Sequence, residues 1–169
     1  SVCHPDKPEK VRRVLDAASK VAGKSLNDFL VSGPNLLLHM PGLVSRFRVG
    51  RVGVSADVKE MFSQVALPKE DERMLIFLWR DMDRSRKPDY YTNCRHIFGA
   101  KCSPSTCSFA LRFLGKKAEA SKKPEFKGVQ EIVELSFYMD DFYQCANTEE
   151  EATRIAHQVQ EALALGKFE

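Results

Sequence analysis

The chain has 169 residues, of which 43% are hydrophobic and 29% are charged, and its formal net charge is +3. These proportions are typical of one globular domain with its own core and argue against disorder. No apolar run approaches the ~18 residues of a membrane span, and the mild charge excludes an arginine-rich nucleic-acid arm but not a nucleic-acid groove beside an acidic site.

The first third of the chain alternates short apolar segments with turns. Residues 1–10 carry two prolines and no periodicity, so we expect extended or loop structure there, followed by a short strand running into a turn at 11–18. Residues 35–47 hold an apolar run interrupted by a Pro-Gly pair, which favours a kinked helix or two short helices. Residues 52–57 alternate in polarity, which predicts a strand ending at an aspartate.

The middle of the chain predicts a strand pair and then a helix. The nearly continuous apolar run at 74–79 predicts a buried strand, and a charged turn at 81–89 leads to its antiparallel partner at 90–98. Residues 103–120 predict a helix, because a serine can cap its start and a proline suits its first turn.

The last third predicts a hairpin and a helix. A basic loop at 122–128 precedes a strand at 133–139, a tight turn made by two aspartates and a return strand at 142–146. A helix is expected at 149–164, because Thr148 opens a TxxE capping box and three glutamates fill the first turn. Mixed helices and antiparallel strands indicate an α+β fold.

Three carboxylates fall at strand ends or in a turn: Asp57, Asp140 and Asp141. Adjacent aspartates at a hairpin tip are unusual, because tips favour Asn-Gly or Asp-Gly and neighbouring carboxylates repel unless a cation lies between them. A solvated acidic turn is the plain alternative, although aromatic residues on both sides of the pair indicate packed strands. Hard divalent cations prefer carboxylate and phosphate oxygens, and two such ions can clamp an in-line phosphoryl transfer.

The composition does not favour a zinc site. The chain has five cysteines and four histidines, but no two cysteines form a CxxC pair and the histidines are scattered. We therefore expect reduced thiols, as in cytosolic or nuclear proteins.

Four segments, in order, resemble the motifs of reverse transcriptases. Their YxDD motif, the polymerase motif C, resembles FYMDDFY at 137–143, and motif A resembles SADVKEMFSQVALP at 55–68. Motif B of retroelements resembles HIFGAKCSPSTCSFAL at 96–111. The fingers-to-palm segment of the Pao/BEL class of LTR retrotransposons resembles residues 11–37. Four motifs in order are a far more specific signal than YxDD alone.

The resemblance implies a polymerase palm with partial fingers, in which an antiparallel sheet carrying a YxDD hairpin packs against helices. It implies one reverse transcriptase domain fragment over 1–169, with partial fingers and the fingers–palm segment at 1–51. Residues 52–169 would be mainly palm, with a fingers-like part at 69–98. We expect the thumb and RNase H to lie outside this stretch, and hence little or no processive synthesis by this chain alone.

The resemblance also implies RNA-directed DNA polymerase activity, in which dNMP passes from a dNTP to a primer 3′-hydroxyl with two Mg²⁺ or Mn²⁺ ions. Asp57 and Asp140 would bind the metals, Asp141 would support them, and the Val58 carbonyl would be a further ligand. The implied partners are a primed RNA or DNA template, dNTPs and other segments of a retrotransposon polyprotein, without a membrane. The implied location is a cytoplasmic virus-like particle or the nucleus.

Four residues would bind the nucleotide in this family: Arg12, Phe62, Phe98 and Gly99. A guanidinium such as that of Arg12 suits triphosphate oxygens, and the Phe62 ring would clash with a ribose 2′-hydroxyl and so select dNTPs. Phe98 would pack under the sugar or base, and Gly99 would allow close backbone approach. The alternatives are a solvated strand face for Arg12 and core packing for the two phenylalanines.

Primer and template contacts are implied for Tyr138, Met139, Lys116 and Lys117. The lysines could neutralise backbone phosphates without reading base sequence. Cross-strand packing is the alternative for Tyr138, and a solvated helix face is the alternative for the lysines.

Two rival functions stay open at the level of sequence. One is a catalytically inactive, domesticated or decayed retroelement fragment that acts as a binding or assembly module, although all three aspartates are intact. The other is a different palm enzyme, either an RNA-dependent RNA polymerase or a nucleotide cyclase, against which Phe62 and the FGAKCSP segment argue.

Overall fold

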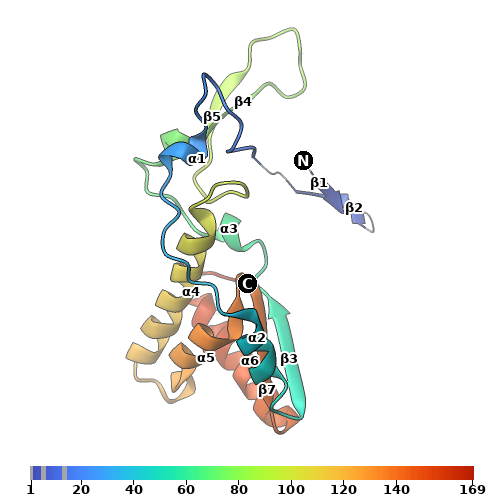
Figure 1. The fold of residues 1–169 in the computed structure, drawn as a ribbon, viewed down its shortest axis with the longest axis vertical. Helices are drawn as coiled ribbons and strands as arrows, with labels where there is room; N and C mark the ends of the chain where they lie inside the picture. Colours follow the sequence, from blue (N-terminus) through green and yellow to red (C-terminus); the bar gives the residue numbers. More distant parts are fainter. Residues whose placement is uncertain (1, 5–6, 13–14) are drawn as a thin grey trace. The chain divides into compact units, whose positions relative to one another are not determined.

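The computed structural model describes residues 2–4, 7–12 and 15–169. The chain forms two compact units, which we describe separately: unit 1 comprises Ser1–Ser32 and Phe62–Ser103, and unit 2 comprises Gly33–Met61 and Pro104–Glu169. Helices mix with antiparallel strands in both, as predicted (Figure 1). No helix in the described part of the chain is long and apolar enough to cross a membrane.

Unit 1 opens with a β-hairpin. Strand β1 (Val2–His4) pairs antiparallel with β2 (Lys7–Arg12), so the stretch predicted to be extended is a paired ribbon. The strand predicted at 11–18 ends at Arg12, residues 13–14 lie outside the described residues, and the rest of that range holds only a turn. A one-turn helix, α1 (Leu26–Phe29), follows.

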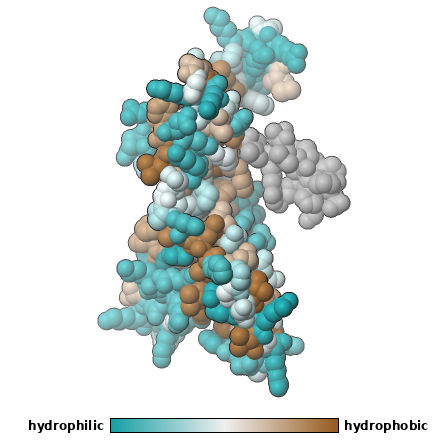
Figure 2. All heavy atoms as spheres, viewed as in Figure 1, coloured by the Kyte–Doolittle hydropathy of each residue, from teal (hydrophilic) through white to brown (hydrophobic). Residues whose placement is uncertain are grey.

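A second two-stranded ribbon in unit 1 consists of β4 (Ile76–Trp79) and β5 (Asp89–Thr92), preceded by the 3₁₀ turn η1 (Glu72–Leu75). The predicted antiparallel pairing is confirmed, but the prediction of a buried strand is wrong. Ile76 is 51% exposed and Leu78 56%, because a ribbon of two strands leaves both of its faces open. Figure 2 shows such apolar side chains at the surface among polar ones.

Unit 2 is built on a three-stranded antiparallel sheet in the order β3-β7-β6. Strand β3 (Val52–Asp57) has the predicted bounds, and β6 (Phe137–Tyr138) and β7 (Asp141–Ala146) form a hairpin. Phe142 and Ala146 are buried on one face, and helices α5 (Val129–Ser136) and α6 (Glu149–Ala164) pack against the sheet. Because successive side chains of a strand point to opposite faces, the residues between these buried ones project from the other face of the sheet.

Helix α2 (Met40–Phe47) is shorter than the helical segment predicted at 35–47. Residues 31–39 form neither helix nor strand. Pro41 lies in the first turn of α2, where its missing N–H has no intrahelical partner to lose, so the proline begins the helix instead of kinking it.

Helix α4 (Ser103–Ala120) has the predicted bounds, with Pro104 in its first turn. Its apolar stripe is buried, since Cys107 is 0% and Leu111 1% exposed. The loop after it contains a short 3₁₀ turn, η2 (Pro124–Phe126). Among the residues that the structure describes, Cys94, Cys102, Cys107 and Cys145 form no disulfide.

The strand predicted at 133–139 is wrong over most of its length, because α5 occupies Val129–Ser136 and β6 keeps only two residues. The buried positions of this segment, Val129, Val133 and Ser136, recur at helical spacing. Gly128 precedes the helix with φ +78°, a conformation that suits glycine and sets the start of the helix.

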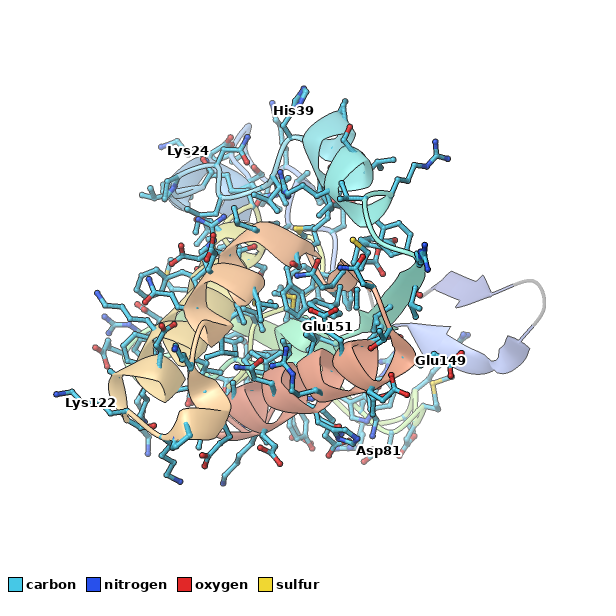
Figure 3. All side chains as sticks on the ribbon, turned by 90° about the horizontal axis from the view of Figure 1, so that it is seen from below. Lys24, His39, Asp81, Lys122, Glu149 and Glu151 are labelled. Atoms are coloured by element: carbon cyan, nitrogen blue, oxygen red, sulfur yellow. The ribbon has the colours of Figure 1, made fainter. Side chains whose placement is uncertain are left out.

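Helix α6 (Glu149–Ala164) has the predicted bounds, and Figure 3 shows Glu149 and Glu151 near its start. Thr148 accepts a hydrogen bond from the Glu151 backbone N–H at 3.2 Å. The Glu151 carboxylate accepts from the Asn147 N–H at 3.0 Å, one residue earlier than a standard capping box would require.

Thr148→Ala should lower the free energy of unfolding by about 1 kcal/mol, because one N–H in the first turn of α6 loses its acceptor. The measurement is urea denaturation, with a lower midpoint and an unchanged slope expected. Thr153→Ala, at an exposed site within the same helix, is the matched control and should not destabilise the protein. Equal loss in both variants would contradict a capping role.

Candidate active site

Three of the predicted site residues form a row across the sheet of unit 2. Asp57 ends β3 directly opposite Asp141, the first residue of β7, and Asp141 in turn lies opposite Tyr138 in β6. Directly opposed residues of an antiparallel pair project to the same face, with Cβ atoms about 4.5–5.5 Å apart. The two carboxylates and the tyrosine therefore share the face opposite to the buried Phe142.

The third carboxylate lies in the turn beside this row. Met139 and Asp140 form the two-residue turn, which corrects the prediction that the two aspartates make it, since Asp141 is already in the strand. The backbone N–H of Val58 donates to the Asp140 carbonyl at 2.8 Å. This bond ties the turn to the residue that follows Asp57, so all three aspartates meet at one end of the sheet.

The other end of the same face is covered by α2. The Phe47 ring contacts the Tyr143 ring edge-on at 5.7 Å between centroids, and a Cβ on Gly53 would lie only 2.9 Å from the Phe47 ring. The Cys145 thiol donates to the Arg46 carbonyl at 3.1 Å. Within unit 2, the helix thus covers one end of the face and leaves the carboxylates outside its footprint, where Asp57 and Asp140 are exposed.

The carboxylates produce a negative potential that raises the pKa of the nearby Tyr143 side chain. Tyr143 lies two residues after Asp141, on the same face of β7. The charge of Asp141 raises the pKa of Tyr143, and burial, a hydrogen bond to the same carboxylate and the charge of Asp140 act in the same direction. Sequence reasoning missed Tyr143 as a neighbour of the site, although its period-two spacing from Asp141 could have indicated it.

The donor chemistry of this end of the sheet suits a hard divalent cation. Among the described residues, no group of three or more His, Cys, Asp or Glu side chains is close enough to hold a metal ion by itself. Mg²⁺ is usually held by one or two carboxylates together with water and substrate phosphates. The facing carboxylates of Asp57 and Asp141 fit that open kind of site, and Val58, whose side chain is buried, is held next to them by its N–H bond.

Two of the predicted nucleotide-binding residues are in contact in unit 1. The Phe62 ring, on the short helix α3 (Met61–Gln64), packs edge-on against the Phe98 ring at 4.7 Å between centroids. Both side chains are half-buried. The contact is compatible with core packing and with a shared apolar surface, so the nucleotide-binding role of the pair stays a prediction.

Gly99 also lies in unit 1 and has φ +104°. A Cβ there would collide with the Leu15 carbonyl, so the close backbone approach that glycine allows is made, in this structure, to the chain's own backbone. The Leu15 N–H donates to the Phe98 carbonyl at 3.2 Å in the same place.

Asn27 holds the loop that carries Gly99, and sequence reasoning missed it. Its side-chain amide donates to the Gly99 carbonyl at 3.0 Å and accepts from the Lys101 N–H at 2.9 Å. Asn27 is more than 70 positions from both Gly99 and Lys101 in the sequence. No spacing rule in the sequence connects residues so far apart.

The remaining predicted residues are one arginine of unit 1 and two lysines of unit 2. Arg12 is the last residue of β2, opposite Val2, and its side chain lies outside the described part of the structure. Lys116 and Lys117 are exposed on α4 in unit 2. Their predicted roles stay predictions.

Comparison with known proteins identifies relatives. Residues 6–169 match the family model described as reverse transcriptase (RNA-dependent DNA polymerase). Among solved structures, a foamy viral protease–reverse transcriptase in complex with double-stranded DNA matches with a TM-score of 0.70 and 21% identity. The match covers 99% of this chain but only 24% of that one, and it shows a shared fold. A comparison with curated proteins gives no match.

Asp141→Asn should lower the pKa of Tyr143 towards its ordinary value, because the nearest negative charge that disfavours tyrosinate is removed. NMR titration of protein labelled with ¹³C at the tyrosine Cζ measures this, and Tyr143→Phe assigns the resonance. Asp83→Asn, in the turn between β4 and β5, serves as the control and should leave Tyr143 unchanged. An unchanged pKa in Asp141→Asn would refute the negative potential assigned to this end of the sheet.

Proposed function

The chain belongs to the reverse transcriptase (RNA-dependent DNA polymerase) family, a family of nucleotidyltransferases, and we propose that it carries the catalytic core of an RNA-directed DNA polymerase. In this proposal residues 1–51 are partial fingers and the fingers–palm segment, and residues 52–169 are mainly palm, with a fingers-like part at 69–98 that contains the β4–β5 ribbon. The reaction transfers dNMP from a dNTP to the 3′-hydroxyl of a primer paired with an RNA or DNA template. The source is an LTR retrotransposon polyprotein of the Pao/BEL class, at work in a cytoplasmic virus-like particle or in the nucleus.

The observation that carries the proposal is the pairing of Asp57 with Asp141, beside a turn that holds Asp140. Asp57 and Asp140 would bind two divalent cations, with the Val58 carbonyl as a further ligand and Asp141 maintaining the negative potential. When bound, Mg²⁺ or Mn²⁺ would neutralise the triphosphate and the oxygens that exchange the phosphoryl group. The protein's own contribution is to hold the carboxylates in place before the substrates arrive.

Nucleotide selection is assigned to residues of unit 1. The Phe62 ring would exclude a ribose 2′-hydroxyl, and its edge-on contact with Phe98 would fix the orientation of the ring. Phe98 would pack under the sugar or base, and Gly99 would lie next to the nucleotide. Arg12 would contact the triphosphate.

Primer and template binding is assigned to the surface around the hairpin and to α4. Tyr138 lies in the same row as Asp141 and Asp57, where it would face the primer terminus together with Met139. Lys116 and Lys117 would neutralise backbone phosphates. The foamy viral relative was solved with double-stranded DNA, which supports a nucleic-acid partner for this chain.

An inactive binding or assembly module is the alternative function. No specific observation favours it, because all three aspartates are present and converge at one end of a sheet. Facing carboxylates are unfavourable in a purely structural sheet, and this cost argues for a cation-dependent role.

Asp57→Asn and Asp140→Asn should each weaken Mn²⁺ binding about tenfold or more and reduce single-nucleotide insertion about 100-fold, because each removes a charged oxygen ligand. Electron paramagnetic resonance of free Mn²⁺ measures binding even where insertion is slow. Asp83→Asn, a carboxylate in unit 1, is the matched control. Wild-type Mn²⁺ affinity in the Asp140→Asn variant would contradict the proposed site.

Phe62→Ala should raise the ratio of rNTP to dNTP insertion about tenfold or more, because the ring that clashes with the 2′-hydroxyl is removed. Single-nucleotide insertion with matched rNTP and dNTP gives the ratio. Phe109→Ala, which truncates an exposed phenylalanine on α4, is the control for general loss of aromatic surface. The steric-gate role is wrong if the Phe62→Ala ratio equals that of wild type.

A further inference from the structure

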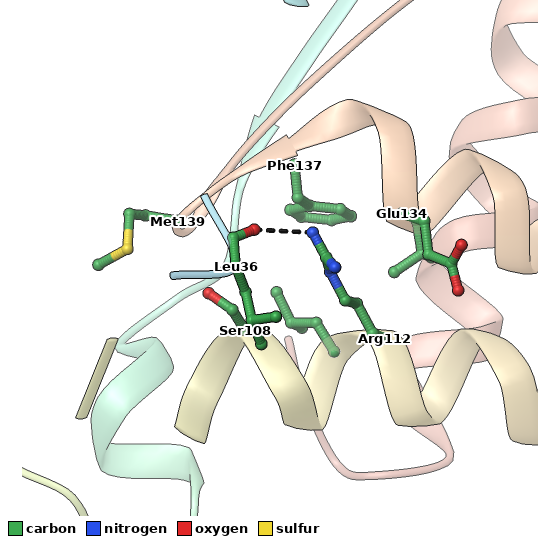
Figure 4. A pocket seen from close by; sticks show the side chains of 8 residues that line it. Leu36, Ser108, Arg112, Glu134, Phe137 and Met139 are labelled. Carbon is green, nitrogen blue, oxygen red and sulfur yellow. Dashed lines mark hydrogen bonds between the residues drawn. The ribbon is translucent and has the colours of Figure 1, made fainter. Parts of the chain in front are cut away.

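The face of β6 opposite to the carboxylate row borders a small pocket in unit 2. Because side chains alternate along a strand, Phe137 projects away from the face on which Tyr138 accompanies Asp141, and Met139 follows in the turn. Both line the pocket, together with Leu36 and with Ser108 and Arg112 of α4 (Figure 4). The pocket therefore lies directly behind the turn that carries Asp140.

Arg112 joins two sides of this pocket. Its guanidinium donates to the Leu36 carbonyl at 2.7 Å, and the bond is partly buried. Figure 4 shows the Arg112 side chain extending from α4 to this carbonyl, with the Phe137 ring beside it. A hydrogen bond from a charged donor is stronger than one between two neutral groups.

Leu36 depends on such bonds for its position, because it lies in the stretch 31–39 that forms neither helix nor strand. Two side chains of α4 attach this stretch to the helix: Arg112 at Leu36, and Ser105, whose hydroxyl donates to the Pro34 carbonyl at 2.9 Å. Ser105 and Arg112 are two helical turns apart and so lie on one face of α4.

The turn itself needs support from its surroundings. Met139 has φ +57°, a left-handed conformation that is unfavourable for a residue with a Cβ. Strained conformations of this kind persist where neighbouring structure holds them. On one side the turn is held by the Val58 N–H bond to Asp140, and on the other it borders the pocket.

We infer that Arg112 is a positioning residue for the reaction: by fixing Leu36 against α4 it maintains the pocket behind β6 and thereby holds the Met139–Asp140 turn. The inference rests on the proposed function for the catalytic meaning of Asp140. Its structural content, the dependence of the turn on Arg112, is measurable without any metal or substrate.

The test uses the ¹³C-labelled ε-methyl groups of the chain's five methionines, with Met139→Leu to assign the resonance of Met139. Arg112→Ala and Arg112→Gln both remove the guanidinium that bonds to Leu36 and should shift the Met139 resonance while the other four stay in place. Arg112→Lys keeps a charged donor of similar reach and should return the resonance towards its wild-type position.

The control is Arg95→Ala, which removes the same kind of bond, from a guanidinium to the Gln64 carbonyl at 2.9 Å in unit 1. It should leave the Met139 resonance unchanged. An unshifted resonance in both Arg112→Ala and Arg112→Gln would overturn the inference. Loss of the dispersed spectrum in both would also overturn it, because Arg112 would then be a residue of general stability.

The same samples separate this inference from the proposed function. Paramagnetic Mn²⁺ should broaden the Met139 resonance of the wild-type chain, because the carboxylates adjoin the turn. Absence of broadening would count against the metal site, while the metal-free comparison of the Arg112 variants would still decide the role of Arg112.

Discussion

The antiparallel pairing of β3 with β7 is the constraint on which the proposed site depends. Its register places Asp57 opposite Asp141, and the first hydrogen bond beyond the strands joins Val58 to Asp140. Carboxylates directly opposite each other in a sheet destabilise it. The pairing tolerates this repulsion because packing against both faces of the sheet anchors and stabilises the strands.

That anchoring comes from both faces of the sheet. Phe142 and Ala146 are buried on the core face, against which α5 and α6 pack. On the other face, Phe47 covers Gly53 and Tyr143, and the Cys145 thiol bonds to the end of α2. The core face is therefore anchored along the whole of β7, including next to Asp141, whereas α2 covers the other face only at the end away from the aspartates, so the carboxylates stay open to ligands.

The parts of the fold that local rules govern could be predicted from the sequence. Period-two alternation gave β3 its bounds, and caps and helical periodicity did the same for α4 and α6. The strand predicted at 133–139 is wrong because Val133 fits both a period of two and a period of 3.6, and the preceding Gly128 favours the start of a helix.

The run at 76–79 is apolar but largely exposed. Neither periodicity nor composition indicates whether a second layer of structure covers a two-stranded ribbon. The sequence indicated aspartates at a strand end and in a hairpin turn, but the register that puts Asp57 opposite Asp141 comes from the structure. The bonds of Asn27 and Arg112 could not be predicted, because they join segments more than 70 residues apart.

The central claim is that the aspartates at this end of the sheet bind divalent cations, which also relieves the repulsion between Asp57 and Asp141, and the free energy of unfolding measured with and without Mn²⁺ tests it most directly. Without metal, Asp57→Asn and Asp141→Asn should each be at least as stable as wild type, because one of two like charges is removed. Mn²⁺ should stabilise wild type, since it binds only the folded site, and should stabilise the double variant Asp57→Asn/Asp141→Asn much less. Equal stabilisation of wild type and the double variant by Mn²⁺ would contradict the account.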